Sequence, residues 1–172
     1  MSTYELRQRL VDIARKDLGA TEVTRNQSPV IKKFWPATSY PEGYSNREPY
    51  CAAAVSYWVR EWLRDPEVLD ALKLTPTSAE KWRCKSAAAF GWTTWAKDKG
   101  LLVMSDSASN VLHKGDIMVF DISHIGIVDT DEGNLVYTCE ANTGASGGRD
   151  GEGIYYKTRK RIEAKNFIRL LS

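Results

Sequence analysis

The stretch Glu48–Trp62, which reads EPYCAAAVSYWVREW, decides how the rest of the chain must be arranged. Its large apolar residues recur at the spacing i, i+3, i+4 and i+7, which predicts an amphipathic helix with one buried face; they are Val55, Trp58, Val59 and Trp62. Proline is tolerated before or within the first turn of a helix but not deeper, so Pro49 places Cys51 near the helix N-terminus. The apolar face needs a second layer to pack against, and the chain downstream must supply it.

Cys51 is open to two interpretations from this stretch alone. The unpaired N–H groups and partial positive charge at a helix N-terminus favour thiolate over thiol, and the thiolate is the nucleophilic form. Against this, cysteine is among the most buried residue types, and most single cysteines in helices are small core residues. We take a catalytic nucleophile as the hypothesis, and the rest of the chain must then supply its base.

The composition predicts a single globular domain over residues 1–172. Of these residues 42% are hydrophobic and 27% charged, with a formal net charge of +2, and the length suffices for one buried core. So small a basic excess gives no argument for nucleic acid, and the run Lys157–Arg161 is expected to be a solvated strand end. Cys51, Cys84 and Cys139 are too widely spaced for a zinc knuckle and indicate no disulfide framework.

The first ten residues, MSTYELRQRL, contain no hydrophobic signal core. No apolar run in the sequence approaches the length needed to cross a bilayer. We therefore expect synthesis in the cytoplasm without a signal peptide and no insertion into a membrane. Any role outside the cytoplasm would need another route of release or delivery.

The first half of the chain carries helical patterns. Ser2 and Glu5 have the spacing of a capping box, and a helical stripe of leucine and isoleucine follows until Gly19. Residues 20–50 are rich in Pro, Ser, Asn and Gly, which predicts a long irregular loop ordered by its aromatic side chains. Further helices are expected at Pro29–Trp35, Glu67–Lys73 and Ser86–Lys99, with a segment of unassigned structure around Ser78–Trp82 before the last.

From Leu101 onward the pattern changes to that of strands. Short β-branched or aromatic runs alternate with turn residues; they are Gly115–Phe120, His124–Thr130, Leu135–Asn142, Ile154–Thr158 and Phe167–Leu170. Residues 131–134, Asp-Glu-Gly-Asn, form a hairpin turn between two of them. The sequence therefore predicts an α+β fold in which N-terminal helices pack on a C-terminal antiparallel sheet of about five to six strands.

His124 is the candidate base, because it opens a strand between two apolar runs. A buried imidazole costs free energy unless a partner satisfies it, so the ring either bonds within the core or stands at the sheet edge facing a thiol. His113 is the less favoured choice, since it lies in a polar turn before Lys114 and Gly115 where a solvated side chain is the default.

The next strand, LVYTCEAN, supplies two candidates for orienting the imidazole. With a period of two, Glu140 and Asn142 share a face with Val136 and Thr138, whereas Cys139 faces the other way as a core residue. Either a carboxylate or an amide bonded to the ring would fix its tautomer and orientation. Both candidates remain open from the pattern alone.

The stretches YCAAAVSYW, GDIMVF followed by HIGIV, and EANTG followed by GGRDGEGIYYKTR together carry a family resemblance. In this order they resemble the cysteine, histidine-dependent amidohydrolase/peptidase (CHAP) family of the papain-like, NlpC-type superfamily, especially its compact phage and bacterial cell-wall hydrolases. The resemblance covers most of the chain. It implies a papain-like fold with Cys51 as nucleophile, His124 as general base, Glu140 as the residue that orients the histidine, and Asn142 near the same site.

That family hydrolyses amide bonds of peptidoglycan, either between N-acetylmuramic acid and L-alanine or within stem peptides and cross-bridges. The resemblance thus implies a cell-wall hydrolase, such as a phage endolysin or an antibacterial toxin, with peptidoglycan as its substrate and no cofactor or metal. A phage endolysin would need a holin-type delivery partner, and an antibacterial toxin would be paired with an immunity protein. Candidate substrate contacts are Tyr44, Tyr50 and Trp92, the last of which is either a core residue or part of a substrate groove.

Two departures from the family pattern bear on these expectations. Some members have glutamine immediately before the cysteine, where this chain has Tyr50, so the oxyanion donors beyond the Cys51 N–H stay open. Some lysins of the family bind calcium through an acidic loop, and residues 129–133 superficially resemble one. The glycine is one place early and no distal glutamate follows, so a plain hairpin is expected. The Gly-rich loop 144–153 and the aromatic loop before Cys51 are expected to flank the substrate groove.

Two rival functions fit the same residues. A papain-like deamidase or protease toxin would keep the three site residues but act on a protein, because fold and catalytic residues do not fix the substrate. A non-catalytic wall-binding or phage-tail module would keep the fold, bind without Cys51, and have a thiol there no more reactive than that of Cys84.

Overall fold

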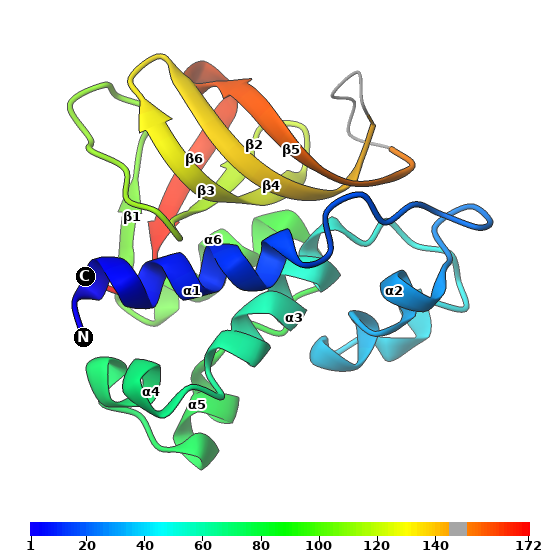
Figure 1. The fold of residues 1–172 in the computed structure, drawn as a ribbon, viewed down its shortest axis with the longest axis horizontal. Helices are drawn as coiled ribbons and strands as arrows, with labels where there is room; N and C mark the ends of the chain where they lie inside the picture. Colours follow the sequence, from blue (N-terminus) through cyan, green and yellow to red (C-terminus); the bar gives the residue numbers. More distant parts are fainter. Residues whose placement is uncertain (145–150) are drawn as a thin grey trace.

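The computed structural model, which describes residues 1–144 and 151–172, has helices on one face of a single curved sheet (Figure 1). Among the described residues the sheet has six antiparallel strands in the order β1-β6-β2-β3-β4-β5. Its strands are β1 (Leu102–Met104), β2 (Ile117–Phe120), β3 (His124–Glu132), β4 (Leu135–Thr143), β5 (Gly153–Lys160) and β6 (Ala164–Arg169). The predicted α+β layout of helices first and an antiparallel sheet second is confirmed.

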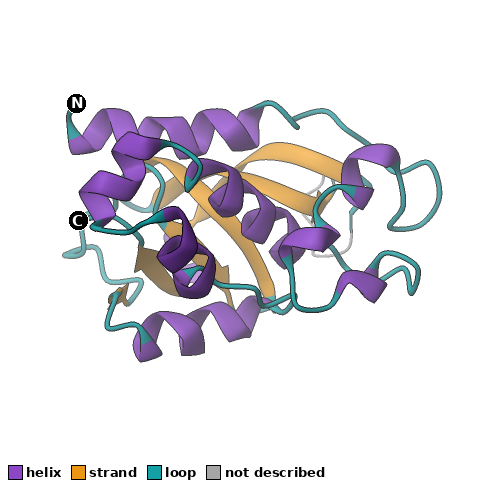
Figure 2. Ribbon diagram, turned by 90° about the horizontal axis from the view of Figure 1, so that it is seen from below, coloured by secondary structure: helices purple, strands orange, loops and turns teal. Residues whose placement is uncertain are grey.

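The helices come almost entirely before the sheet in the sequence. They are α1 (Thr3–Arg15), α2 (Pro29–Lys32), α3 (Cys51–Trp62), α4 (Pro66–Leu72), α5 (Pro76–Trp82) and α6 (Ala89–Asp98), with short 3-10 helices η1 (Trp35–Ala37), η2 (Pro41–Gly43) and η3 (Arg161–Glu163). Seen from below, they lie over one face of the strands (Figure 2). Helices α1 and α3 pack against β3 and β4, whereas α6 packs against β1, β2 and β6. No helix in the described ranges is long and apolar enough to cross a membrane.

Helix α3 is fixed in this layer by its tryptophans as well as by its apolar face. The indole N–H of Trp58 donates to the Asp17 carboxylate at 2.8 Å, and that of Trp62 donates to the Leu6 carbonyl at 2.8 Å. Both rings are buried, and a buried indole N–H normally needs such a partner. The helix that begins at Cys51 is therefore held at two points by α1 and the turn after it.

The two faces of the sheet bury different sets of side chains. Ile125, Ile127, Cys139 and Ala141 belong to the main core, which they share with α1 and α3. Phe120, Val128, Val136 and Phe167 belong to a second, smaller core. Because successive strand residues alternate between faces, the residues on either side of Cys139 in β4 point toward the second core. The predicted division of β4, with Cys139 on one face and Val136, Thr138 and Glu140 on the other, is confirmed.

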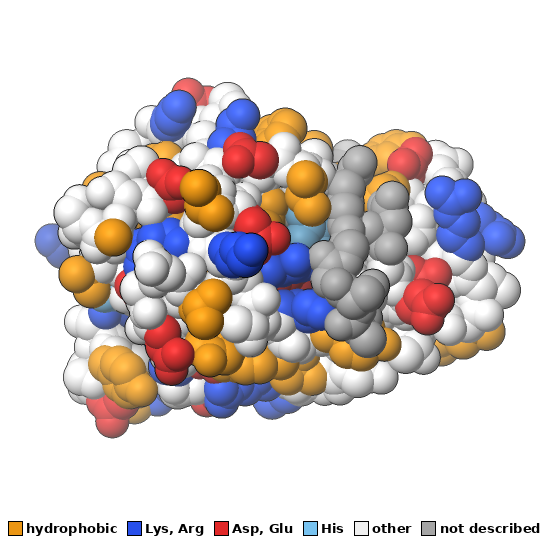
Figure 3. All heavy atoms as spheres, turned by 90° about the horizontal axis from the view of Figure 1, so that it is seen from above, with side chains coloured by type: hydrophobic (Ala, Val, Ile, Leu, Met, Phe, Trp, Pro, Cys, Tyr) orange, Lys and Arg blue, Asp and Glu red, His pale blue; other side chains and the backbone are white. Residues whose placement is uncertain are grey.

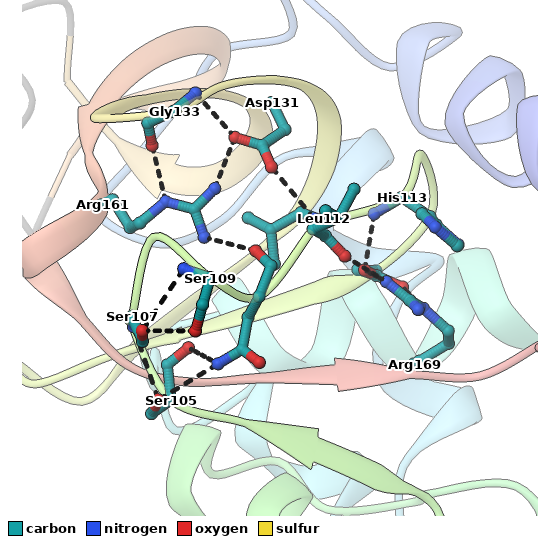
Figure 4. A network of polar contacts seen from close by, with 12 residues as sticks. Ser105, Ser107, Ser109, Leu112, His113, Asp131, Gly133, Arg161 and Arg169 are labelled. Atoms are coloured by element: carbon teal, nitrogen blue, oxygen red, sulfur yellow. Dashed lines mark hydrogen bonds and ion pairs between the residues drawn. The ribbon is translucent and has the colours of Figure 1, made fainter.

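The connection between β1 and β2, residues 105–116, is tied to the sheet by a polar network (Figure 4). Arg161 donates to the carbonyls of Gly133 and Asn110 at 2.5 and 3.0 Å and to the Asp131 carboxylate at 2.5 Å. Asp131 in turn accepts from the Leu112 N–H at 3.0 Å. One buried arginine thus joins the β1–β2 connection to the β3–β4 hairpin.

The polar surface above the sheet carries both signs of charge. In Figure 3, acidic and basic side chains are interspersed over this face. That mixture agrees with the near balance of 24 basic and 22 acidic residues in the sequence.

Several predicted boundaries differ from the observed ones. Helix α1 ends at Arg15 rather than near Gly19, because the N–H of Gly19 (φ +86°) bonds to the Ile154 carbonyl of β5 at 2.9 Å instead of continuing the helix. Strand β1 was not predicted: it has only three residues and pairs along the edge with β6. The Asp131–Asn134 segment does make the β3–β4 hairpin, with Gly133 at φ +78°.

Candidate active site

Cys51 is the first residue of α3 and lies at the wall of a pocket of about 410 Å³. Its side chain is mostly buried, with 5% of the residue exposed. Among the described residues no side chain caps this end of α3, so the first backbone N–H groups of the helix stay available to a ligand. The thiol and the helix N-terminus therefore face the same pocket.

The rest of the pocket wall comes from three segments that are far apart in the sequence. They are the loop and 3-10 helices before α3, the segment that enters α6, and the turn before β3. Lining residues include Trp35, Tyr40, Glu48, Ser86, Ala89 and Ser123. The pocket thus combines aromatic walls with hydroxyl groups and one carboxylate, which suits a polar ligand of peptide size better than a purely apolar one.

His124 opens β3 directly after Ser123 and is fully buried. Its Nε2 lies 2.6 Å from Oε1 of Glu140, and its ring lies 5.2 Å from that of Phe120, the residue opposite it in β2. The Cys51 thiol lies close enough to interact with the same ring. Nδ1 has no hydrogen-bond partner among the described residues, so it is the ring nitrogen available to the thiol.

Glu140 is held on three sides in the middle of β4. Besides His124, its carboxylate accepts from the Thr138 hydroxyl at 2.5 Å and from Arg159 of β5 at 2.7 Å (Nε to Oε2) and 2.5 Å (Nη2 to Oε1). The residue is fully buried. A buried carboxylate with this many donors is retained in its ionised form.

Gly126 makes space for Glu140 on the neighbouring strand. The two residues are directly paired between β3 and β4. A Cβ atom at position 126 would lie 2.7 Å from Cγ of Glu140, closer than Cβ atoms approach other atoms in proteins, and 3.0 Å from the Cys139 carbonyl oxygen, which is also tight. A glycine is therefore required for the Glu140 side chain to lie flat against β3 and reach His124.

The charges of this group shift one another's pKa values. Burial alone lowers the pKa of His124, but its contacts with the Cys51 thiol and the Glu140 carboxylate outweigh burial and raise it from 6.5 to about 9. Burial raises the pKa of Glu140, but Arg159 and then His124 outweigh it and lower that pKa from 4.5 to about 2. Near neutral pH the pair is therefore imidazolium and carboxylate.

The other two cysteines have a different environment. Cys84 and Cys139 are buried, and burial is the main cause that raises the pKa of Cys84 to about 11 and that of Cys139 to about 12. Both thiols stay protonated at neutral pH and have little nucleophilic character. Cys139 packs in the main core, where the strand pattern places it.

His113 lies away from this group. Its backbone N–H donates to Asp116 at 2.8 Å in the network of Figure 4. Burial and the charges of Arg169 and Arg7 lower its pKa. The structure brings His124, and not His113, to the thiol of Cys51.

Asn142 is near the group but does not hold the histidine. It sits at a register shift between Ala141 and Thr143, with φ +55°, so strict alternation of β4 ends there. Its side chain is buried, and neither atom of its amide has a hydrogen-bond partner among the described residues. Of the two candidates from the sequence, Glu140 is the one bonded to His124.

The candidate substrate contacts need correction, because the described residues that line the Cys51 pocket include none of Tyr44, Tyr50 and Trp92. Tyr50 is fully buried, and its hydroxyl donates to Glu22 at 3.3 Å; burial raises its pKa above the usual range. Trp92 is a core residue that packs edge to face on Trp95 at 5.4 Å. Both are bulky apolar rings that gain more from burial than from facing a wet groove.

Tyr44 is only partly buried and turns toward α2 rather than toward Cys51. Its hydroxyl lies 3.5 Å from the Ser28 carbonyl, and the Lys32 ammonium lies 6.0 Å above its ring. The predicted Gly-rich wall at 144–153 falls largely outside the described residues, which omit 145–150.

Sequence reasoning missed three residues that build this group: Thr138 as a donor, Gly126 and Arg159. Thr138 was placed on the correct face but given no role. Arg159 belongs to the basic run Lys157–Arg161, which was predicted to be solvated. The arginine is in fact buried, with 6% of the residue exposed. Its place in β5 opposite Val136 puts it on the same face as Glu140, and a strand register would have revealed that.

No family model, curated protein or solved structure matches the chain. The function is therefore argued from the site and from the sequence resemblance. Among the described residues, no group of three or more His, Cys, Asp or Glu is arranged to hold a metal ion. The carboxylate of Asp129 pairs with Arg15 and Lys114, and that of Asp131 with Arg161.

Proposed function

We propose that this chain is a papain-like cysteine hydrolase of the CHAP type that cleaves an amide bond of peptidoglycan. The observation that carries the proposal is the row formed by Cys51, His124 and Glu140, with the thiol on a pocket and the other two buried behind it. Nucleophile, base and orienting group in this order are the minimum for acyl transfer through a cysteine. The peptidoglycan substrate rests on the sequence resemblance.

In the first half of the reaction, the Cys51 thiolate attacks the carbonyl carbon of the scissile amide. The oxyanion that forms is stabilised by the Cys51 N–H and the positive end of α3. The His124 imidazolium then gives its proton to the amide nitrogen, the C–N bond breaks, and the amine leaves. The acyl group stays on Cys51 as a thioester.

In the second half, water replaces the amine. His124, now neutral, takes a proton from the water as its oxygen attacks the thioester carbonyl. The C–S bond breaks, the carboxylic acid leaves, and the thiolate and imidazolium are restored. Glu140 remains a carboxylate throughout and keeps Nδ1 of the ring directed at the sulfur.

Digestion of purified peptidoglycan, followed by mass spectrometry of the released fragments, tests the proposal. The wild type should release fragments, the Cys51→Ala variant none, and the Cys84→Ala variant the same fragments as the wild type. New lactyl-muramic ends would mean an amidase, and cut stems or cross-bridges an endopeptidase.

If the wild-type protein releases no fragments from any type of cell wall, the peptidoglycan assignment is wrong. The reactivity of the Cys51 thiol then separates the rivals. A thiol that iodoacetamide alkylates faster than Cys84 indicates an enzyme acting on a protein, whereas equal rates indicate a binding module.

A further inference from the structure

Arg159 of β5 is the second charged group that contacts the Glu140 carboxylate, and its Nη2 shares Oε1 with Nε2 of His124. Its guanidinium approaches both carboxylate oxygens, at 2.7 and 2.5 Å, in the two-point geometry that arginine forms with carboxylates. The guanidinium lies 5.0 Å from the centre of the Phe120 ring, and that ring also contacts His124. The contact between Arg159 and Glu140 is thus as direct as that between His124 and Glu140.

The other charged and titratable groups around the three residues are few in the described ranges. Arg159 also lies 3.9 Å from the exposed Glu163 of η3 and 3.4 Å from the Thr143 hydroxyl. Glu140 meets the neutral Thr138 on its own strand. His124 meets Cys51 of α3. The groups that act on His124 at close range are therefore Cys51 and Glu140, and Arg159 contacts the same Glu140 oxygen as His124.

This arrangement has a consequence for proton transfer. A bare buried carboxylate beside an imidazole stabilises the imidazolium strongly, and a histidine that holds its proton too tightly is a poor acid toward a leaving amine. We propose that Arg159 is a positioning residue that partly neutralises Glu140, fixes its orientation, and thereby keeps the proton affinity of His124 within the range that catalysis needs. The inference rests on the proposed function for its catalytic meaning, but its effect on Cys51 can be measured without any substrate.

The test is the pH dependence of Cys51 alkylation by iodoacetamide, read by mass spectrometry of the labelled peptide. Loss of the His124 imidazolium proton changes the reactivity of the neighbouring thiol, and the midpoint of that step is the upper midpoint of the profile. Cys84 and Cys139 serve as internal thiols of low reactivity. The variants are Arg159→Gln, which removes the charge, and Arg159→Lys, which keeps the charge but loses the two-point contact with the Glu140 carboxylate.

Arg161→Gln is the matched control. Arg161 is equally buried and holds the carboxylate of Asp131 at 2.5 Å, but in the network of Figure 4 rather than at the site. It should lower thermal stability as Arg159→Gln does and leave the alkylation profile unchanged.

We expect Arg159→Gln to raise the upper midpoint by about one pH unit, as the loss of one nearby charge commonly does. Arg159→Lys should return it to within about 0.3 units of the wild type on the same argument. An upper midpoint in Arg159→Gln equal to that of the wild type, or a shift that Arg159→Lys does not reverse, overturns the proposal.

Arg159→Gln leaves a buried carboxylate short of a partner and could fail to fold. The comparison is then made between Glu140→Gln and the Glu140→Gln/Arg159→Gln double variant, in which both buried charges are removed together. The double variant should have the higher upper midpoint, because it lacks a cation near His124. Equal midpoints contradict the proposal.

Peptidoglycan digestion separates this inference from the proposed function. If the wild type cuts no wall while the alkylation shifts appear as expected, the substrate assignment fails and the role of Arg159 stands. If the wild type cuts and Arg159→Gln changes neither its alkylation profile nor its kcat, the role of Arg159 fails alone.

Discussion

The side chain of Glu140 occupies space that exists only because residue 126 is glycine. An added methyl group would meet Cγ of Glu140 at 2.7 Å and the backbone of β4 at 3.0 Å. Cγ is near the root of the side chain, so Glu140 could escape the clash only by moving its carboxylate away from His124 and Arg159. Gly126 is buried, and a close-packed interior offers no easy relaxation.

Gly126→Ala should therefore lower the unfolding free energy by about 1–3 kcal/mol, the usual cost of overpacking, and reduce kcat by about tenfold or more through misplacement of the histidine. Urea denaturation and the peptidoglycan digestion rate measure the two effects. Gly133→Ala is the control: it strains the hairpin at φ +78° with open space around it, so stability should fall while activity per folded molecule stays. Equal activity losses in both variants would contradict the stated role of Gly126.

Residue types predicted the three side chains that meet at this candidate site better than the residues that support them. Cys51, His124 and Glu140 carry chemistry that a strand pattern and a helix N-terminus make visible. Arg159 was not found, because its role depends on which strand lies beside β4, and pairing partners distant in sequence are not encoded in local periodicity. Trp92 and Tyr50 were wrongly assigned to the groove, since an aromatic ring near a candidate nucleophile is compatible with either core or groove.

At the scale of elements, the position of Cys51 depends on how α3 is fastened to α1. The Trp58 indole N–H bonds to Asp17, which also pairs with Lys33. The bond is buried, and its acceptor is charged, so it contributes more than an ordinary hydrogen bond.

Trp58→Phe should keep most of the ring packing and remove this bond, lowering the unfolding free energy by about 1–3 kcal/mol. Chemical denaturation followed by far-UV circular dichroism measures the change. Tyr4→Phe, at a side chain that is 60% exposed, should leave stability within about 0.5 kcal/mol of the wild type. A Trp58→Phe protein as stable as Tyr4→Phe would show that the bond does not fasten α3.

The elements themselves were largely predictable from the sequence, and the exceptions have physical causes. Runs with a period of two predicted the long strands β3 and β4. Alternate side chains of each strand pack into the main core and into the second core. Strand β1 was not predicted, because Leu102 is exposed and Val103 is partly exposed. The segment therefore lacks an alternating pattern of apolar and polar residues. The start of α6 was predicted at Ser86, but the helix begins at Ala89. The Ser86 hydroxyl bonds to the backbone of Ala88 and so holds a turn before the helix.

For the whole molecule, the buried pair of His124 and Glu140 makes stability depend on pH in two windows. The pKa of His124 is raised from 6.5 to about 9, so its contribution is complete below pH 6.5 and is lost as pH rises through 9. The pKa of Glu140 is lowered from 4.5 to about 2, so its contribution is complete above pH 4.5 and is lost as pH falls through 2. Both contributions are present together between these limits.

The difference in Tm between the wild type and Glu140→Gln should therefore be largest between pH 4.5 and 6.5. This Tm difference should become smaller as pH rises through 9, where the imidazolium loses its proton. It should also become smaller as pH falls toward 2, where the Glu140 carboxylate gains one. Thermal unfolding at a series of pH values measures the difference. A difference that stays constant across the whole range would mean that the two residues are not coupled as ions.

The order of the strands also bears on how the molecule is made. Strand β6 is the last in the sequence but lies between β1 and β2, pairing Phe167 with Met104 on one side and with Met118 on the other. While the chain is still emerging from the ribosome, β1 and β2 therefore each present an unpaired edge to the solvent, and such edges invite aggregation. The sheet closes only when β6 leaves the exit tunnel, so a chaperone that shields those two edges would be needed until that strand has emerged.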